Sequence, residues 1–223
     1  MSEASRVTPH FADVMLDLET FGTAPGCVIP AIGAVQFDPE TGMGGPRFYA
    51  EIDIEDAARH GLGFEAMTVK WWLAQSDAAR GAVTGNRRRM PLVAALHSFA
   101  AFLPPDARIW GNGADFDPPI LAEAYRRAGI DIPWKPYAAR CYRTLKNLRR
   151  DIPMERTGTH HNALDDAISQ ARHACALLQA LRPPQPAAPP PPAAEFHGVQ
   201  AHGAGFPHHR HPGEGRDPDL TRA

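Results

Sequence analysis

The sequence predicts a layered α/β domain followed by a disordered C-terminal tail. Three observations support this. Three β-type runs follow one another near the N-terminus, and helical and strand-like stretches then alternate, as in α/β layered folds. The chain is 43% hydrophobic and 22% charged, a composition typical of a soluble globular protein. The composition then changes sharply after Arg182.

The change at Arg182 divides the 223 residues into a domain, 1–182, and a tail, 183–223. The segment 183–194 holds seven prolines, too many for a helix or a sheet, and predicts extended polyproline or disorder. The rest of the tail is rich in Gly, His and Pro and has little to bury. Its "HHRH" could capture a divalent metal ion, but a solvated tail with incidental histidines is favoured.

Four β-type runs are expected within the domain. The second is apolar on both faces, which is typical of a central strand. The "DPETGMGG" segment that follows it suits a connection between antiparallel neighbours. The four runs cover 13–20, 28–38, 45–53 and 107–112.

Five stretches have helical character, and they cover 64–80, 91–103, 118–129, 140–151 and 162–181. Proline stands in the first turn of the third stretch, a favoured position. Apolar residues recur in the last one at spacings of three and four, which predicts a single face packed on a sheet or helix. That face consists of Leu164, Ile168, Ala171, Cys175 and Leu178.

Charge, cysteines and termini restrict the class of protein. The net charge of -2 shows no basic excess for nucleic acid, although a protein that holds phosphates through metal ions needs none. Cys27, Cys141 and Cys175 lie far apart without a CxxC pair, which argues against disulfides and structural zinc and favours a reducing compartment. No secretory signal and no run of ~18 apolar residues are evident. We therefore expect a cytoplasmic protein without a membrane partner.

Asp17 and Glu19 stand two residues apart in "MLDLETFGT". Residues i and i+2 of a strand project from the same face, so both carboxylates point one way. Two anions in a largely apolar strand repel each other and lose hydration, which folded proteins usually accept when a cation lies between them. The alternative is a strand end with a polar edge, and this pair alone does not decide.

A second acidic group stands in "WGNGADFD", between a predicted strand and a helix. Ligands of α/β sheets collect at the carboxyl ends of strands, so Asp115 and Asp117 are both candidates. Asn112 and its flanking glycines suit a close approach of backbone to ligand. Asp117 could instead cap the helix that follows, and the two roles are compatible.

The third group is "GTHHNALDDA", at the start of the last helix. His160 and His161 are expected in the loop or first turn, with Asp165 and Asp166 one turn inside. The two aspartates fall on opposite flanks of the predicted apolar face, so a helical wheel does not choose between them. Paired histidines are usually incidental, but a nearby carboxylate cluster favours a function.

Together, "DLET", "GNGADFD" and "HNALDDA" resemble the three motifs of the DnaQ-like 3′→5′ exonucleases, the DEDD superfamily with an RNase H-like fold. The histidine five residues before the last aspartate resembles the histidine that marks the DEDDh branch of this superfamily. "MLDLETFGTAPGCVIPAIGAVQFDPETG", "TVKWWLAQS" and "CYRTLKNL" resemble a subgroup with phage-type exonucleases, the nuclease part of exonuclease VIII and RNase AS-type exoribonucleases. The likeness covers roughly residues 12–180 and implies a mixed sheet flanked by helices.

The resemblance implies a complete catalytic set. Asp117 is preferred to Asp115 because the family aspartate follows a phenylalanine, and Asp166 is preferred to Asp165 because it lies five residues after His161. Two Mg²⁺ or Mn²⁺ ions, bound through carboxylate oxygens, would serve an in-line displacement. The implied metal ligands are Asp17, Glu19, Asp117 and Asp166, and the implied general base is His161.

The implied substrate is single-stranded DNA or RNA with a free 3′ end, which is cut to nucleoside 5′-monophosphates. The mixed subgroup slightly favours DNA, or a broad preference for single strands of both kinds. One of Trp71 and Trp72 can be buried while the other lies near the surface, where it could stack on a terminal base; the alternative is two buried aromatics. Basic residues gather at 87–89 and 140–150, where Arg143, Lys146 and Arg150 form a helical stripe suited to phosphates. Asn112 is a further candidate for substrate contact.

Related enzymes are often dimers, so a homodimer is an expectation. The alternatives are a binding module without catalysis and a nucleotide phosphatase.

Overall fold

A five-stranded mixed sheet forms the centre of the computed structural model, which describes residues 8–85 and 88–183. Its strand order is β3-β2-β1-β4-β5. The first three strands pair antiparallel, while β4 and β5 are parallel to β1. The strands are β1 (Asp13–Glu19), β2 (Ala31–Phe37), β3 (Gly44–Glu51), β4 (Arg108–Gly111) and β5 (Ala139–Cys141). The RNase H-like prediction of a mixed sheet flanked by helices is confirmed.

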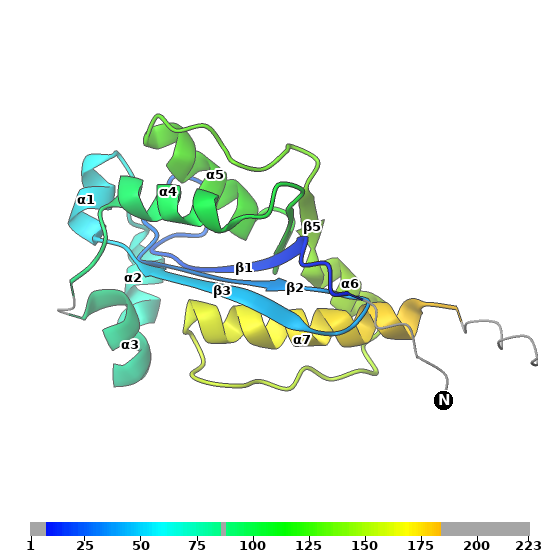
Figure 1. Cartoon of the computed structure of the whole chain (residues 1–223). Coiled ribbons are helices and arrows are strands. Elements are labelled where there is room, and N and C mark those ends of the chain that lie inside the picture. The colour runs from blue at the N-terminus through cyan, green and yellow to red at the C-terminus, as the bar shows by residue number, and fades with distance from the viewer. Residues whose placement is uncertain (1–7, 86–87, 184–223) are drawn as a thin grey trace, which may run out of the picture. The chain divides into compact units, whose positions relative to one another are not determined.

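Helices cover both faces of this sheet. In Figure 1, α4 and α5 lie over one face, and α7 runs along the other. The helices are α1 (Ile54–Arg59), α2 (Ala66–Leu73), α3 (Asp77–Thr84), α4 (Leu92–Phe102), α5 (Asp117–Arg127), α6 (Tyr142–Leu148) and α7 (Ala163–Leu181). None of the helices in the described ranges is long and apolar enough to cross a bilayer.

Alternation along β1 explains the two cores. Val14, Leu16 and Leu18 project toward α4 and α5 and join the larger hydrophobic cluster. Met15 projects the other way and packs with residues of α7. Because side chains alternate along a strand, Asp17 and Glu19 continue the face of Met15. Both carboxylates therefore point toward the side of the sheet that α7 covers.

Several expected boundaries are wrong for local reasons. The stretch 64–80 is two helices, because Ser76 starts a second one by accepting a hydrogen bond from the N–H of Ala79. A short helix at Ile54–Arg59 was not expected, although the Asp53 side chain caps it. The stretch 140–151 begins as the edge strand β5, and only three residues pair there, too few for a period-2 pattern.

The predicted apolar face of the last helix is displaced. Ala171 and Cys175 are buried, but Leu164, Ile168 and Leu178 are only half-buried. The most buried face of α7 instead consists mainly of small and polar residues, namely Ala163, Ala167, Gln170, Ala171 and Ala174, together with Leu177. The small residues in its first turns let the helix approach the sheet closely.

Gly33 of β2 makes the closest approach between the sheet and α7. It pairs with Asp17 across β1 and β2. A Cβ atom at this position would lie 2.1 Å from the carbonyl carbon of Ala163 and 2.3 Å from the amide nitrogen of Leu164. No side chain fits there, so the glycine allows the first turn of α7 to lie against the strand that borders Asp17.

The predicted tail, 183–223, lies outside the described residues except for Pro183. The tail and its histidine cluster therefore stay predictions.

Candidate functional site

The site lies at the end of β1, under the N-terminus of α7. Carboxylate oxygens of Asp17, Glu19 and Asp166 all lie within 4.8 Å of one another. Glu19 is 6% exposed, and the side chain of Asp166 is 13% exposed. Residues 149 positions apart are thus brought together by the docking of α7 on the strand.

Asp117 adds a fourth carboxylate from the start of α5, and its charge acts on both Asp17 and Glu19. It is 2% exposed, and its two carboxylate oxygens accept hydrogen bonds from the backbone N–H of Leu18 (3.2 Å) and of Asn112 (2.9 Å). These bonds tie the start of α5 to the ends of β1 and β4. The N-cap position of α5 is Phe116, without a side-chain cap bond, so the capping alternative for Asp117 is wrong.

Gly111 explains why Asp117 can lie so close to β4. A Cβ atom on Gly111 would lie 3.0 Å from a carboxylate oxygen of Asp117 and 2.8 Å from the Cδ of Pro118. The close approach that the glycines of "WGNG" predict is therefore made, but here it admits a side chain of the protein itself.

The two ambiguous aspartates differ clearly in position. Asp115 is exposed, in contrast to the buried Asp117. Asp165 turns away from the acidic group and accepts a hydrogen bond from the backbone N–H of Thr159 at 2.7 Å. Asp166 accepts one from the N–H of His161 at 3.0 Å and faces Asp17 and Glu19. The structure thus brings together Asp17, Glu19, Asp117 and Asp166, and leaves the other two outside.

Burial and mutual repulsion make these carboxylates difficult to ionise. Burial, and then the charges of Asp117, Glu19 and Asp166, hold the pKa of Asp17 well above its usual range. Burial, Asp166 and Asp117 raise the pKa of Glu19 to about 8. Burial raises the pKa of Asp117 to about 6, although the N–H groups of Asn112 and Leu18 oppose this shift. Further positive charge would therefore be needed for all four carboxylates to ionise together.

One buried oxygen in the site also lacks a partner. Oε1 of Glu19 is buried and accepts no hydrogen bond from any described residue. A buried acceptor left unpaired is costly, and oxygen atoms of carboxylates are the ligands that Mg²⁺ and Mn²⁺ prefer. The donor set and the unpaired oxygen both fit a hard divalent cation.

His161 lies at the rim of this acidic group. It belongs to the loop before α7 and has a positive φ of 60°, a backbone conformation that is uncommon outside glycine. Its ring packs edge-on against Trp71, with centroids 5.0 Å apart, and lies 3.8 Å from that of His160. Burial and the neighbouring His160 lower the pKa of His161. This shift favours the neutral imidazole, which is the form that can accept a proton.

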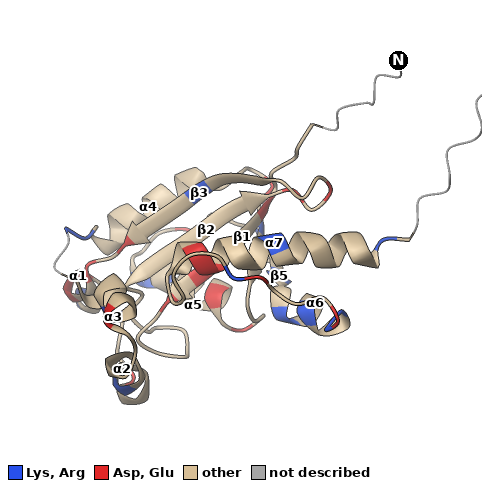
Figure 2. Ribbon diagram, turned by 90° about the horizontal axis from the view of Figure 1, so that it is seen from below, with Lys and Arg blue, Asp and Glu red and all other residues tan. Residues whose placement is uncertain are grey.

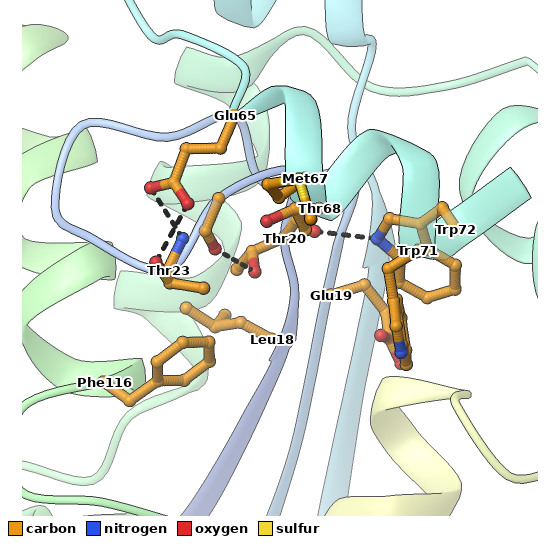
Figure 3. Close-up of a pocket in the computed structure, with 11 residues that line it drawn as sticks. Leu18, Glu19, Thr20, Thr23, Glu65, Met67, Thr68, Trp71, Trp72 and Phe116 are labelled. Carbon is orange, nitrogen blue, oxygen red and sulfur yellow. Dashed lines mark hydrogen bonds between the residues drawn. The ribbon is translucent and has the colours of Figure 1, made fainter.

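A pocket of about 530 Å³ opens beside Glu19. Figure 3 shows Leu18 and Phe116 on one side of it and Trp71 with Glu19 on the other. Trp72 is 4% exposed and donates its indole N–H to the carbonyl of Thr20, whereas Trp71 is 44% exposed. The predicted division of the two tryptophans between core and surface is confirmed.

Gln170 is a site residue that sequence reasoning missed. It is 5% exposed, and its side-chain N–H donates to a carboxylate oxygen of Asp17 at 2.7 Å. It stands four residues after Asp166, and therefore on the same face of α7. This four-residue spacing from Asp166 is the feature of the sequence that could have indicated Gln170 as a site residue. The bond fixes the orientation of Asp17 and lowers its pKa, in opposition to the surrounding anions.

The predicted basic stripe is shorter than expected. Helix α6 ends at Leu148, so Arg150 does not continue it, and Arg149 pairs with Asp151. Arg143 is exposed and close enough to Asp117 to lower its pKa, and Lys146 lies over the ring of Tyr142. Figure 2 shows the basic residues of α6 beside the sheet. Arg143 and Lys146 remain candidates for phosphate contact.

Two other predicted contacts differ from expectation. Asn112 binds Asp117 through its backbone, and its buried side-chain oxygen has no partner within the described ranges. Of the basic run at 87–89, Arg87 lies outside the described residues, and Arg89 donates to three backbone carbonyls of the protein.

A comparison with protein families finds one match over nearly the whole domain. The family model described as a 3′-5′ exoribonuclease Rv2179c-like domain matches residues 12–178. No curated protein sequence matches the chain.

Solved structures share the fold at low sequence identity. The nuclease domain of 3′hExo, a DEDDh family member bound to rAMP, is 14% identical with a TM-score of 0.51, covering 75% of this chain and 92% of that one. E. coli Exonuclease I in complex with a dA16 oligonucleotide is 18% identical with a TM-score of 0.54, covering 77% and 41%. Cell-death related nuclease 4 is 12% identical with a TM-score of 0.51, covering 77% and 65%.

Proposed function

This chain belongs to the Rv2179c-like 3′-5′ exoribonuclease domain family and is a 3′→5′ exonuclease, and we propose that it shortens single-stranded RNA from the 3′ end, releasing nucleoside 5′-monophosphates. The observation that carries the proposal is the convergence of Asp17, Glu19, Asp117 and Asp166, with an unpaired buried oxygen on Glu19. Such a group is costly to a fold unless it binds cations.

In this proposal the four carboxylates hold two ions, Mg²⁺ or Mn²⁺, which would activate water and stabilise the leaving oxygen. Gln170 orients Asp17, and the N–H groups of Leu18 and Asn112 orient Asp117. His161 accepts the proton of the attacking water. Its lowered pKa supports this role, because only the neutral imidazole is a base.

The family description supports RNA, whereas the resemblance to a mixed subgroup slightly favours DNA or a broad preference for single strands of both kinds. The structural neighbours do not decide the sugar, since one is bound to rAMP and another to dA16. The pocket beside Glu19 suits a terminal nucleoside, because it combines an exposed indole with the apolar side chains of Leu18 and Phe116. Arg143 and Lys146 would hold the strand behind it.

The proposed function is tested with two 5′-labelled single strands of matched sequence, one RNA and one DNA. Each is incubated with the full chain and Mg²⁺, Mn²⁺ or EDTA. We expect a metal-dependent ladder that shortens from the 3′ end, faster on RNA. Binding without any ladder would identify a module that has lost catalysis. Release of phosphate from a mononucleotide, with the strands intact, would identify a phosphatase.

Trp71→Ala is expected to weaken single-strand binding. Loss of a base-stacking surface costs ~1–3 kcal/mol, or about 5- to 150-fold in affinity. Fluorescence anisotropy with a labelled strand measures the change. Leu73→Ala is the matched control, since Leu73 lies on the same helix, is 68% exposed and does not line the pocket. Equal affinity of the Trp71 variant and wild type would exclude stacking.

The homodimer and the cytoplasmic location stay predictions.

A further inference from the structure

Arg156 reaches into the site from the loop that precedes α7. Its guanidinium lies 2.5 Å from the Oδ1 oxygen of Asp166, whose other oxygen accepts the N–H of His161. Asp166 is one of the three acids whose oxygens lie within 4.8 Å of one another. A positive charge therefore already contacts the carboxylate group at the point where a cation is proposed to bind.

The backbone beside Arg156 is fixed, but its side chain is not enclosed. The N–H of Thr157 donates to Oγ of Ser169 at 3.0 Å, and Ser169 is 1% exposed on α7. The side chain of Arg156 is 50% exposed, in contrast to the 13% of Asp166. A long side chain with an anchored base and an exposed head can change partner without moving the loop.

We propose that Arg156 is a resident counter-ion of the metal-free site, which a bound metal ion displaces from Asp166 and which then holds a phosphate of the nucleic acid. This rests on the proposed function. Asp166 cannot give its full charge to both a guanidinium and a metal ion, so the two compete. Guanidinium forms paired hydrogen bonds to phosphate oxygens as readily as to carboxylates. Metal binding would thus prepare the site for its substrate.

The first test is the affinity of EDTA-treated full-length protein for Mn²⁺, measured by calorimetry without nucleic acid. We expect Arg156→Gln to bind Mn²⁺ about three- to five-fold more tightly than wild type, which is the size of effect for a half-exposed ion pair. Arg156→Lys, which keeps the charge, should bind as wild type does. Arg172→Gln is the matched control, because Arg172 is exposed on α7 and its guanidinium donates a hydrogen bond to the hydroxyl of Thr157.

The second test is the affinity for a labelled single-stranded RNA in Ca²⁺, with strand length checked on a gel. We expect Arg156→Gln to weaken binding about five-fold or more, although it improves Mn²⁺ binding. Weaker Mn²⁺ binding by this variant would overturn the proposal, because Arg156 would then support the metal-bound site. Tighter Mn²⁺ binding with unchanged RNA affinity would overturn the transfer to phosphate. Failure of wild type to bind Mn²⁺ would instead contradict the proposed function.

Discussion

Asp17→Asn is expected to lower the exonuclease rate roughly a thousand-fold or more while leaving the protein folded. Asp17 lies at the centre of the acidic group, where its charge interacts with those of Asp117, Glu19 and Asp166. Loss of a proposed metal ligand is expected to remove several kcal/mol of transition-state stabilisation, and each 1.36 kcal/mol is about ten-fold in rate. Asparagine keeps the oxygen that accepts the Gln170 bond, so the substitution changes charge more than shape.

The measurement is the rate of strand shortening at saturating Mg²⁺, together with the thermal midpoint of the metal-free protein. The midpoint should rise, because one of several repelling anions is gone. Asp115→Asn is the control, since Asp115 is exposed and belongs to the same acidic motif as Asp117. Near-normal activity of the Asp17 variant would contradict the assignment.

The metal-free protein is expected to become less stable as the pH rises from about 4.5 to about 8. The pKa of Glu19 is raised from 4.5 to about 8, and that of Asp117 from 3.8 to about 6. Between these values the folded state holds more protons than the unfolded state, so the free energy of unfolding falls with pH. No penalty exists below the lower pKa values, and it is complete above the upper ones.

Thermal unfolding of EDTA-treated protein across this range measures the effect, and a fall in the midpoint of about 5 °C or more is expected. Saturating Mn²⁺ should remove most of the dependence, since the ion neutralises the same carboxylates. Glu19→Gln should flatten the curve without metal. A metal-free midpoint that is constant from pH 5 to 8 would show that these acids ionise normally.

Patterns with a clear period predicted most of the fold. Alternation in β1 and the helical spacing in α7 placed the long elements within a few residues. The two acids of "DLET" were predictable as a pair, because i and i+2 on a strand share a face whatever the tertiary structure.

The rest of the site depends on tertiary contacts that a linear pattern does not contain. Asp165 and Asp166 are equivalent on a helical wheel, and only the loop that returns to bind Asp165 separates them. Gln170 contacts Asp17 from 153 residues away. Arg156 occupies an irregular loop, where no period indicates the direction of its side chain.

The close packing of α7 on Gly33 means that the acidic group is complete only after the last helix has folded onto the sheet. Asp17 and Glu19 are synthesised early, but Asp166 lies on α7, the helix that must pack against Gly33. A chain that has not yet added and docked residues 163–170 holds an incomplete acidic group. An unfinished or truncated copy would therefore lack one of the four acids, and the appearance of exonuclease activity would report that α7 has docked on the sheet.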